Sequence, residues 1–136
     1  MEKNPTTLFV VAAALTNQAG EILLQKRPDG RQMAGLWEFP GGKVEDGESP
    51  ESALVRELHE ELGIEVSATN LRPITFASEP LQGRNLLLLL YRCTQWQGEP
   101  AALDSPELRW LRPAAMHGLP MPPADKPLVL ALESAA

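Results

Sequence analysis

The chain has 136 residues, a length typical of one domain with a buried core, and we expect a single domain over residues 1–136. Its net charge of −6, without a visible basic patch, argues against a nucleic-acid polymer as the main partner. Cys93 is the single cysteine, no apolar run approaches the roughly 20 residues of a membrane span, and the N-terminus lacks a signal-peptide pattern. We therefore expect a cytoplasmic protein, either a monomer or a homodimer, with no membrane partner.

The N-terminal third is predicted to form a β-hairpin followed by a glycine-rich loop. The apolar run LFVVAAAL at 8–15 predicts a buried strand, and turn residues at 17–20 lead to a returning strand at 21–26. A loop over 28–36 then leads into the segment WEFPGGK at 37–43. Gly41 and Gly42 there permit a close backbone approach that a side chain would forbid.

Residues 49–63 predict a helix with both ends marked in the sequence. Ser49 is a good cap, Pro50 suits the first helical position, and Gly63 is a typical stop. One apolar stripe for a core recurs every four residues, at Leu54, Leu58 and Leu62.

Three carboxylates occupy a second face of the same predicted helix. Glu57, Glu60 and Glu61 are spaced i, i+3 and i+4, so they lie together and repel one another. Mg²⁺ would remove this conflict, because it prefers oxygen ligands and is usually held by carboxylates together with substrate phosphates. A solvated acidic helix face is the alternative. The preceding glycine loop, and Arg56 within the helix, favour the metal site.

The second half predicts more strands and a closing helix. We expect a short strand within 65–74, a polar hairpin connection at 75–85, and a strand buried on both faces at 86–93. A loop at 95–105, a strand at 107–111 and an irregular Pro-rich stretch at 113–123 follow. Residues 125–133 predict a C-terminal helix, so the fold class is α/β with a mixed sheet between helices.

The stretch from Gly42 to Ile64, GKVEDGESPESALVRELHEELGI, fills every fixed position of GX5EX7REUXEEXGU, where U is a bulky aliphatic residue. This stretch resembles the signature box of the Nudix hydrolases. The resemblance implies an α/β/α sandwich and hydrolysis of a diphosphate linked to another group, with Mg²⁺ or Mn²⁺ as cofactor.

Other segments resemble the MutT-like branch of this family. They are LWEFPGGKVE at 36–45 and, in the C-terminal part, WQGEP and PPADKP. This branch implies a nucleoside triphosphate pyrophosphohydrolase acting on an oxidised nucleotide such as 8-oxo-dGTP. The implied metal ligands are Gly41, Glu57, Glu60, Glu61 and Asp104. The implied catalytic residues are Arg56, as the partner that orients Glu57, together with the three box glutamates. The implied substrate contacts are Arg27, Glu38, Phe39, Pro40, Gly41, Lys43 and Asp125.

Several of these positions have a second possible role. Asp104 stands where the branch has a glutamate, and Glu107 is a nearby alternative ligand. Asp125 stands where the branch has an asparagine, and it could also cap the last helix. Phe39 could belong to the core, and Arg27 could be a solvated strand end.

Related enzymes that hydrolyse CTP and other pyrimidine nucleotides also resemble this chain and carry Asp in a similar PAD-x-P context. They make a pyrimidine nucleotide the alternative substrate. Two other hypotheses are a non-catalytic Nudix module that senses a nucleotide, and an enzyme acting on a nucleotide sugar or dinucleotide. The intact glutamate set argues against the first, and the lack of a long insertion argues against the second.

Overall fold

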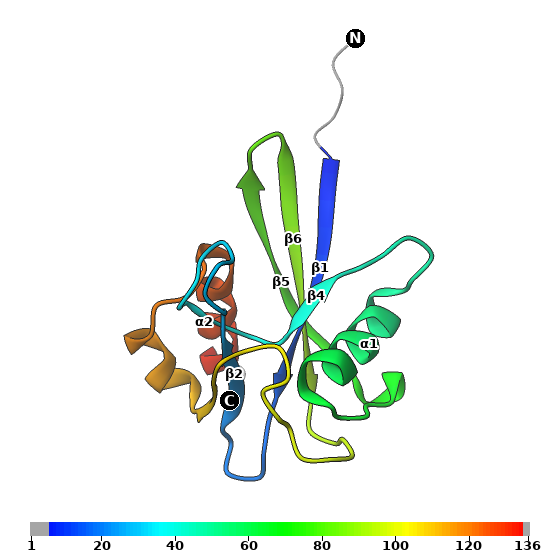
Figure 1. Cartoon of the computed structure of the whole chain (residues 1–136), viewed down its shortest axis with the longest axis vertical. Helices are drawn as coiled ribbons and strands as arrows, with labels where there is room; N and C mark the ends of the chain where they lie inside the picture. Colours follow the sequence, from blue (N-terminus) through cyan, green and yellow to red (C-terminus); the bar gives the residue numbers. More distant parts are fainter. Residues whose placement is uncertain (1–5, 135–136) are drawn as a thin grey trace.

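The computed structural model describes residues 6–134 (Figure 1). Within that range the strands are β1 (Thr6–Leu15), β2 (Ile22–Lys26), β3 (Trp37–Glu38), β4 (Gly41–Lys43), β5 (Arg72–Leu81), β6 (Arg84–Cys93) and β7 (Leu108–Leu111). The helices are α1 (Pro50–Leu62) and α2 (Lys126–Ser134), with short 3-10 helices η1 (Ala68–Asn70), η2 (Pro113–Gly118) and η3 (Pro123–Asp125). Residues 1–5, which bear on the expected lack of a signal peptide, and residues 135–136 lie outside the described residues.

The described strands form two sheets. The larger sheet has the order β4-β1-β6-β5, in which β1 and β6 run parallel while the two outer strands run antiparallel to their neighbours. The smaller sheet is antiparallel, with the order β3-β2-β7. The predicted mixed sheet is therefore confirmed, and a second sheet accompanies it.

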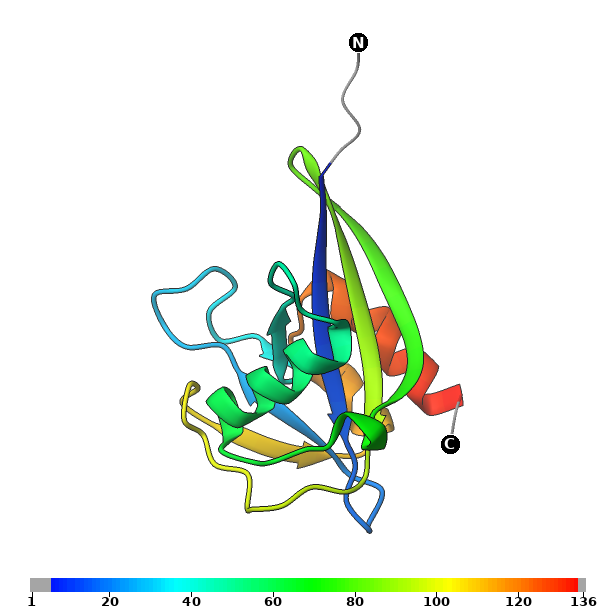
Figure 2. The same ribbon diagram turned by 90° about the vertical axis from the view of Figure 1, so that its right-hand side faces the viewer.

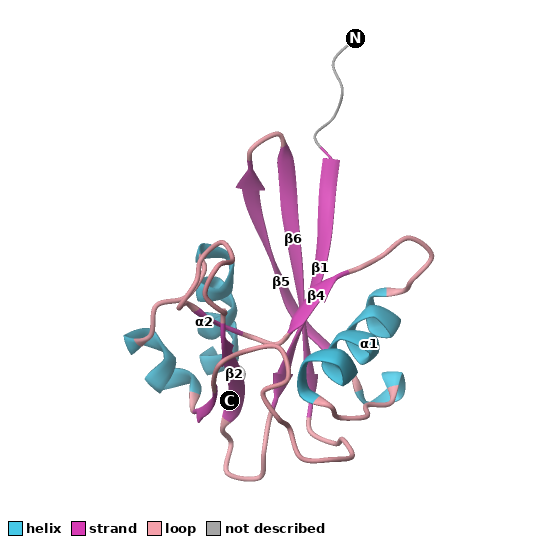
Figure 3. Cartoon of the chain, in the orientation of Figure 1, coloured by secondary structure: helices cyan, strands magenta, loops and turns pink. Residues whose placement is uncertain are grey.

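Strand β1 forms the centre of the molecule because its two faces belong to two different cores. Val11, Ala13 and Leu15 pack with the apolar stripe of α1, whereas Ala12 and Ala14 pack with residues of α2. Alternate side chains of a strand point to opposite faces, so a continuous apolar run serves both layers. Figures 1 and 2 show α1 and α2 on opposite sides of this sheet, which confirms the sandwich, and Figure 3 distinguishes the helical and strand layers by colour.

Helix α1 matches the sequence prediction at both ends. The Ser49 side chain accepts a hydrogen bond from the backbone N–H of Ser52, and Pro50 occupies the first turn. Gly63 takes a left-handed conformation with φ of 72°, and its N–H donates to the carbonyl of His59. The stripe of Leu54, Leu58 and Leu62 is fully buried, and it fixes which face of the helix turns toward the cavity described below.

The turn expected at 17–20 and the strand that follows it are confirmed, but the predicted hairpin pairing between 8–15 and 21–26 is wrong. These strands meet only in an isolated bridge between Thr16 and Ile22, after which β2 joins the other sheet. Strand β1 lies inside the sheet, so both of its backbone edges pair with other strands, and these are β4 and β6. Strand β2 pairs instead with β3 and β7.

Two further predictions are wrong in the region between the helices. The expected polar connection at 75–85 is mostly strand, because β5 extends to Leu81 and pairs with β6 around a turn at 82–83. Most of its residues are exposed, which explains their largely polar character, and Figure 2 shows that the hairpin projects beyond the rest of the sheet. The expected short strand within 65–74 is reduced to a bridge between Glu65 and Gln97, followed by η1 and the start of β5.

The remaining element predictions are confirmed. Strand β7 and helix α2 begin within one residue of their predicted starts, and residues 113–123 contain only short 3-10 turns. Among residues 6–134, no helix is both long enough and apolar enough to span a membrane.

Candidate active site

A cavity of about 320 Å³ lies where the end of β2, strand β4 and the buried side of α1 meet. Its lining brings together residues that are far apart in the sequence. Charged and amide side chains contribute most of that lining, namely Gln25, Lys26, Arg27, Arg31, Glu38, Lys43, Glu57, Glu61 and Asp104. The backbone of Gly41 and Gly42 supplies the floor next to the glutamates.

The two glycines let the helix carboxylates approach β4. A Cβ atom on Gly42 would lie 2.4 Å from the carboxyl carbon of Glu57. A Cβ on Gly41 would lie 1.9 Å from the backbone carbonyl oxygen of Val11 in the neighbouring strand. At Gly41 the obstacle is the backbone of β1, so this position requires glycine for reasons of space. At Gly42 the obstacle is the end of the flexible Glu57 side chain, which a larger residue would displace.

Arg56 fixes the Glu57 carboxylate from the side of the loop that precedes α1. Its Nη1 donates to Glu57 Oε1 at 2.8 Å, and its Nε donates to Glu48 Oε2 at 2.8 Å. Its Nη2 donates to the backbone carbonyl of Lys43 at 3.1 Å. The hydrogen bond from Arg56 lowers the pKa of Glu48 to about 2. A planar guanidinium bound at several points holds its partners in a defined orientation.

Glu61 is a buried carboxylate at the inner wall of the cavity. Its Oε2 accepts hydrogen bonds from Gln25 Nε2 at 2.7 Å and from the backbone N–H of Gly41 at 3.2 Å. Burial raises the pKa of Glu61, the Gln25 and Gly41 donors lower it, and the negative charge of Glu57 raises it, so that it lies at about 8. A cation between these two carboxylates would relieve both effects.

Glu60 differs from the other box glutamates. Its side chain is 58% exposed, and its carboxylate is 3.4 Å from Arg56 Nη1. Within residues 6–134, no three carboxylate, imidazole or thiol groups already gather closely enough to hold a metal ion. The set expected from the sequence is thus divided: Glu57 and Glu61 line the cavity, whereas Glu60 is absent from its lining and faces a separate hollow on α1.

The donors present nevertheless fit a hard divalent cation. Glu57 and Glu61 offer carboxylate oxygens, and Gly41 brings its backbone to the same wall. Mg²⁺ in phosphate sites is usually held by one or two carboxylates, with substrate phosphates and waters as the remaining ligands. The repulsion between two carboxylates at a buried wall is the feature that a cation would neutralise.

Arg27 and Glu38 form an ion pair at the rim of the cavity. Arg27 Nη1 is 3.0 Å from Glu38 Oε2, and Arg27 Nε donates to the carbonyl of Gln32 at 2.8 Å. Burial raises the pKa of Glu38 although the charge of Arg27 acts in the opposite direction. Arg27 is therefore not a freely solvated strand end.

Asp104 and Glu107, the two candidates for the late metal ligand, lie in different surroundings. Asp104 lines the cavity, and its carboxylate is 3.4 Å from Arg31 Nη2. Glu107 pairs with Arg109 at 3.1 Å and is absent from the cavity lining. The geometry therefore favours Asp104.

Phe39 and Asp125, the residues expected to face the base, are both buried, and neither lines the cavity. Phe39 is 4% exposed and packs in the core that includes α2. The Asp125 carboxylate accepts a hydrogen bond from the backbone N–H of Phe39 at 3.4 Å. Burial and the charge of Glu38 raise the pKa of Asp125, against the Phe39 N–H, to about 7. Pro40 is likewise buried, and its carbonyl accepts from the Ala13 N–H.

Three of the charged and amide residues that line the cavity were not predicted from the sequence, namely Gln25, Lys26 and Arg31. A signal for Gln25 was present, because residues two apart in a strand share a face and Gln25 lies two residues before Arg27. Arg31 comes from the loop at 28–36, where no regular pattern indicates the direction of a side chain.

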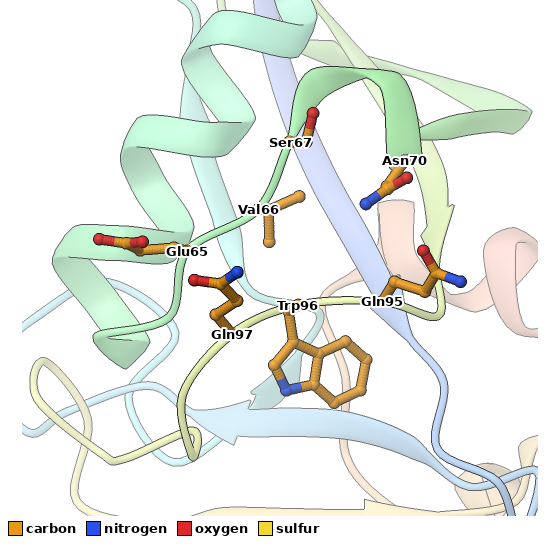
Figure 4. Close-up of a pocket in the computed structure, with 7 residues that line it drawn as sticks. All are labelled: Glu65, Val66, Ser67, Asn70, Gln95, Trp96 and Gln97. Carbon is orange, nitrogen blue, oxygen red and sulfur yellow. The ribbon is translucent and has the colours of Figure 1, made fainter.

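A second hollow, of about 400 Å³, lies beyond the C-terminal end of α1 (Figure 4). It is lined by Glu65, Val66, Ser67, Asn70, Gln95, Trp96 and Gln97. This lining includes no lysine or arginine, so it lacks the cations that a polyphosphate requires.

Comparisons with known proteins agree with this geometry. The family model described as NUDIX domain matches residues 6–132. The CTP pyrophosphohydrolase of Escherichia coli is 42% identical over 122 residues, which are 90% of this chain and 89% of that protein. The 8-oxo-dGTP diphosphatase of the same organism is 32% identical over 126 residues, 93% of this chain and 96% of that protein.

Solved structures show the same likeness. In a structure and function analysis of MutT from Aliivibrio salmonicida and Vibrio cholerae, the matched chain superposes with a TM-score of 0.81 at 32% identity. The match covers 96% of this chain and all of that one. Family model, relatives and fold agree, and the chain therefore belongs to the Nudix hydrolase family.

Proposed function

We propose that this protein is a nucleoside triphosphate pyrophosphohydrolase that requires Mg²⁺ or Mn²⁺ and converts a nucleoside triphosphate and water into the monophosphate and pyrophosphate. One observation carries the proposal. The carboxylates of Glu57 and Glu61 line one cavity with Arg27 and Lys43, so metal ligands and phosphate-binding cations face the same space. The substrate is a small molecule, and no nucleic-acid polymer is required.

Glu57 and Glu61 would hold the divalent metal, with the Gly41 carbonyl and Asp104 as further oxygen ligands and Glu60 approaching from the outer side. When bound, the metal would screen the phosphate charges, lower the pKa of a coordinated water and stabilise the leaving pyrophosphate. Arg56 keeps Glu57 in the orientation that this binding needs.

The cations of the cavity bind the triphosphate. Lys43, Lys26 and Arg31 all line the cavity, and each can donate to phosphate oxygens. Arg27 donates to the carboxylate of Glu38, and a phosphate oxygen can compete for the same guanidinium. A carboxylate of the cavity takes the proton from the attacking water, since carboxylates are the acceptors that line this wall.

The preferred base is proposed from the relatives and from Asp125. Relatives named for 8-oxo-dGTP support an oxidised purine, and the more similar CTP pyrophosphohydrolase supports a pyrimidine. An amide both donates and accepts, as a protonated carboxyl does, whereas an ionised carboxylate only accepts. Burial keeps the pKa of Asp125 near 7, so either form is accessible to it at neutral pH.

The decisive experiment measures kcat/KM with Mg²⁺ for 8-oxo-dGTP, dGTP, dCTP and 5-methyl-dCTP by following pyrophosphate release. A preference for 8-oxo-dGTP makes the protein an 8-oxo-dGTP diphosphatase. A preference for the cytosine nucleotides makes it a pyrimidine nucleotide pyrophosphohydrolase. Absence of turnover with any of them, in Mg²⁺ or Mn²⁺, overturns the proposal and leaves a non-catalytic nucleotide-binding module.

A further inference from the structure

Gln25 is a cavity residue whose side chain has no role in the reaction proposed above. It is 5% exposed, it lies on β2 and it lines the cavity beside Glu61. Its Nε2 donates to Glu61 Oε2 at 2.7 Å. Its own Oε1 is buried and lacks a hydrogen-bond partner, the one such buried side-chain atom among residues 6–134.

The orientation of this amide follows from what surrounds Glu61 Oε2. That oxygen also accepts the backbone N–H of Gly41 at 3.2 Å, so it serves as an acceptor on both sides. A metal ligand is an ionised carboxylate. Beside ionised Glu61 the facing atom of Gln25 is the NH2 group, since a rotated amide would place two acceptors 2.7 Å apart. The unpaired Oε1 is a consequence of the bond to Glu61.

An apolar residue would suit position 25 better if packing alone mattered. The preceding residues of the strand, Ile22, Leu23 and Leu24, are buried and apolar. A buried acceptor without a partner destabilises the folded state, whereas an apolar side chain of similar size carries no such penalty. The amide at position 25 is therefore explained by the hydrogen bond that its N–H donates to Glu61.

We propose that Gln25 is a positioning residue for the metal-dependent reaction, an inference that rests on the proposed function. Its side-chain N–H and the backbone N–H of Gly41 together hold Oε2 of Glu61. This leaves Oε1 of Glu61 as the oxygen free to bind the divalent cation. Partners that orient a ligating carboxylate in this way contribute strongly to metal affinity and activity.

The test compares Gln25→Leu with the wild-type protein in two measurements. Mn²⁺ affinity is measured by electron paramagnetic resonance on the protein alone, and kcat and KM are measured with the preferred nucleotide. We expect a loss of about 10–100-fold in Mn²⁺ affinity, in kcat or in both, with KM changed by less than about threefold. The matched control is Gln97→Leu, because Gln97 is exposed and lies in the other hollow (Figure 4).

A second variant covers the case in which the leucine protein does not fold. Gln25→Asn keeps the amide but is one methylene too short to reach Glu61, so the folded variant should show the same losses. Mn²⁺ affinity and kcat within about twofold of the wild type in whichever variant folds would overturn the positioning role. The Mn²⁺ measurement needs no substrate, so it still reports on Gln25 if the wild-type protein hydrolyses no nucleotide and the proposed function fails.

Discussion

At Gly42 the backbone of β4 passes so close to Glu57 that the lack of a side chain decides where the carboxylate can lie. We expect Gly42→Ala to displace the Glu57 side chain and to lower kcat by about a hundredfold, because a shift of about 1 Å in a reacting group has that effect. Steady-state kinetics measure the loss. Gly118→Ala is the matched control, since open space surrounds Gly118.

An unchanged kcat in Gly42→Ala would show that Glu57 does not act from the position described here. Circular dichroism and the melting temperature separate this result from unfolding. The control should leave both kcat and melting temperature unchanged.

Glu57 and Glu60 should differ in their effects because the structure places them differently. Glu57 lines the cavity and receives Arg56 Nη1 at 2.8 Å, whereas Glu60 is largely exposed. We expect Glu57→Gln to lower kcat by more than about a hundredfold, beyond the 10–100-fold typical of partners outside the ligand shell. Glu60→Gln should lower kcat less.

The comparison of the two glutamine variants is made at saturating Mg²⁺ with pyrophosphate release as the readout. Near-normal turnover by Glu57→Gln would exclude the assigned chemistry. Equal losses in both variants would show that Glu60 turns inward when metal and substrate bind.

At the scale of single elements, α1 depends on its cap. The Ser49 hydroxyl accepts the Ser52 N–H at 3.1 Å, so Ser49→Ala should lower the free energy of unfolding by about 1 kcal/mol. Urea denaturation measures the change. Ser67 precedes η1 without a capping hydrogen bond from its side chain, so Ser67→Ala is the control and should change stability little. Equal losses in the two variants would contradict the capping role.

The elements that the sequence predicted well are those with local signals. Ser49, Pro50 and Gly63 mark the ends of α1 within a few residues of the chain, and the same holds for the start of α2. The partner of a strand carries no local signal. The segment at 21–26 was recognised as a strand, yet its pairing with β7 depends on residues that lie far along the chain.

The candidate site shows the same contrast between features with local sequence signals and features that depend on distant segments. The spacing of Glu57, Glu60 and Glu61 predicted one shared helix face, but only the packing of α1 against the sheet decides which of them line the cavity. Gln25 and Arg31 belong to the site because the end of β2 and the loop at 28–36 border the cavity that Glu57 and Glu61 of α1 also line. Such contacts between distant segments follow from the tertiary structure and not from periodicity.

At the scale of the whole molecule, Asp125 links folding to pH. Burial raises its pKa from 3.8 to about 7, so between these pH values the folded protein binds a proton that the unfolded chain has lost. The stability that the neutral carboxyl contributes is complete below about pH 4 and is lost as the pH rises through about 7. Glu61, whose pKa is also raised, acts in the same direction.

We therefore expect Asp125→Asn to gain stability relative to the wild type as the pH rises from 4 to 8, by up to about 4 kcal/mol. Urea denaturation at each pH measures both proteins, and the contribution of Glu61 is common to the two and cancels in the difference. Parallel stability curves would show that the Asp125 carboxyl does not change its pKa on folding.

The parallel pairing of β1 with β6 has a consequence for how the protein is made. Thr6 lies opposite Arg84 and Leu15 opposite Cys93. The ribosome therefore synthesises β6, the parallel partner of β1, much later than β1 itself. At a synthesis rate of about 5–20 residues per second, the roughly eighty intervening residues take about 4–16 s. During that time the edge of this apolar strand that pairs with β6 stays open, although β4 is already available to its other edge. Residues 6–15 therefore leave the ribosome as an apolar strand with one open edge, a feature that favours aggregation and chaperone binding.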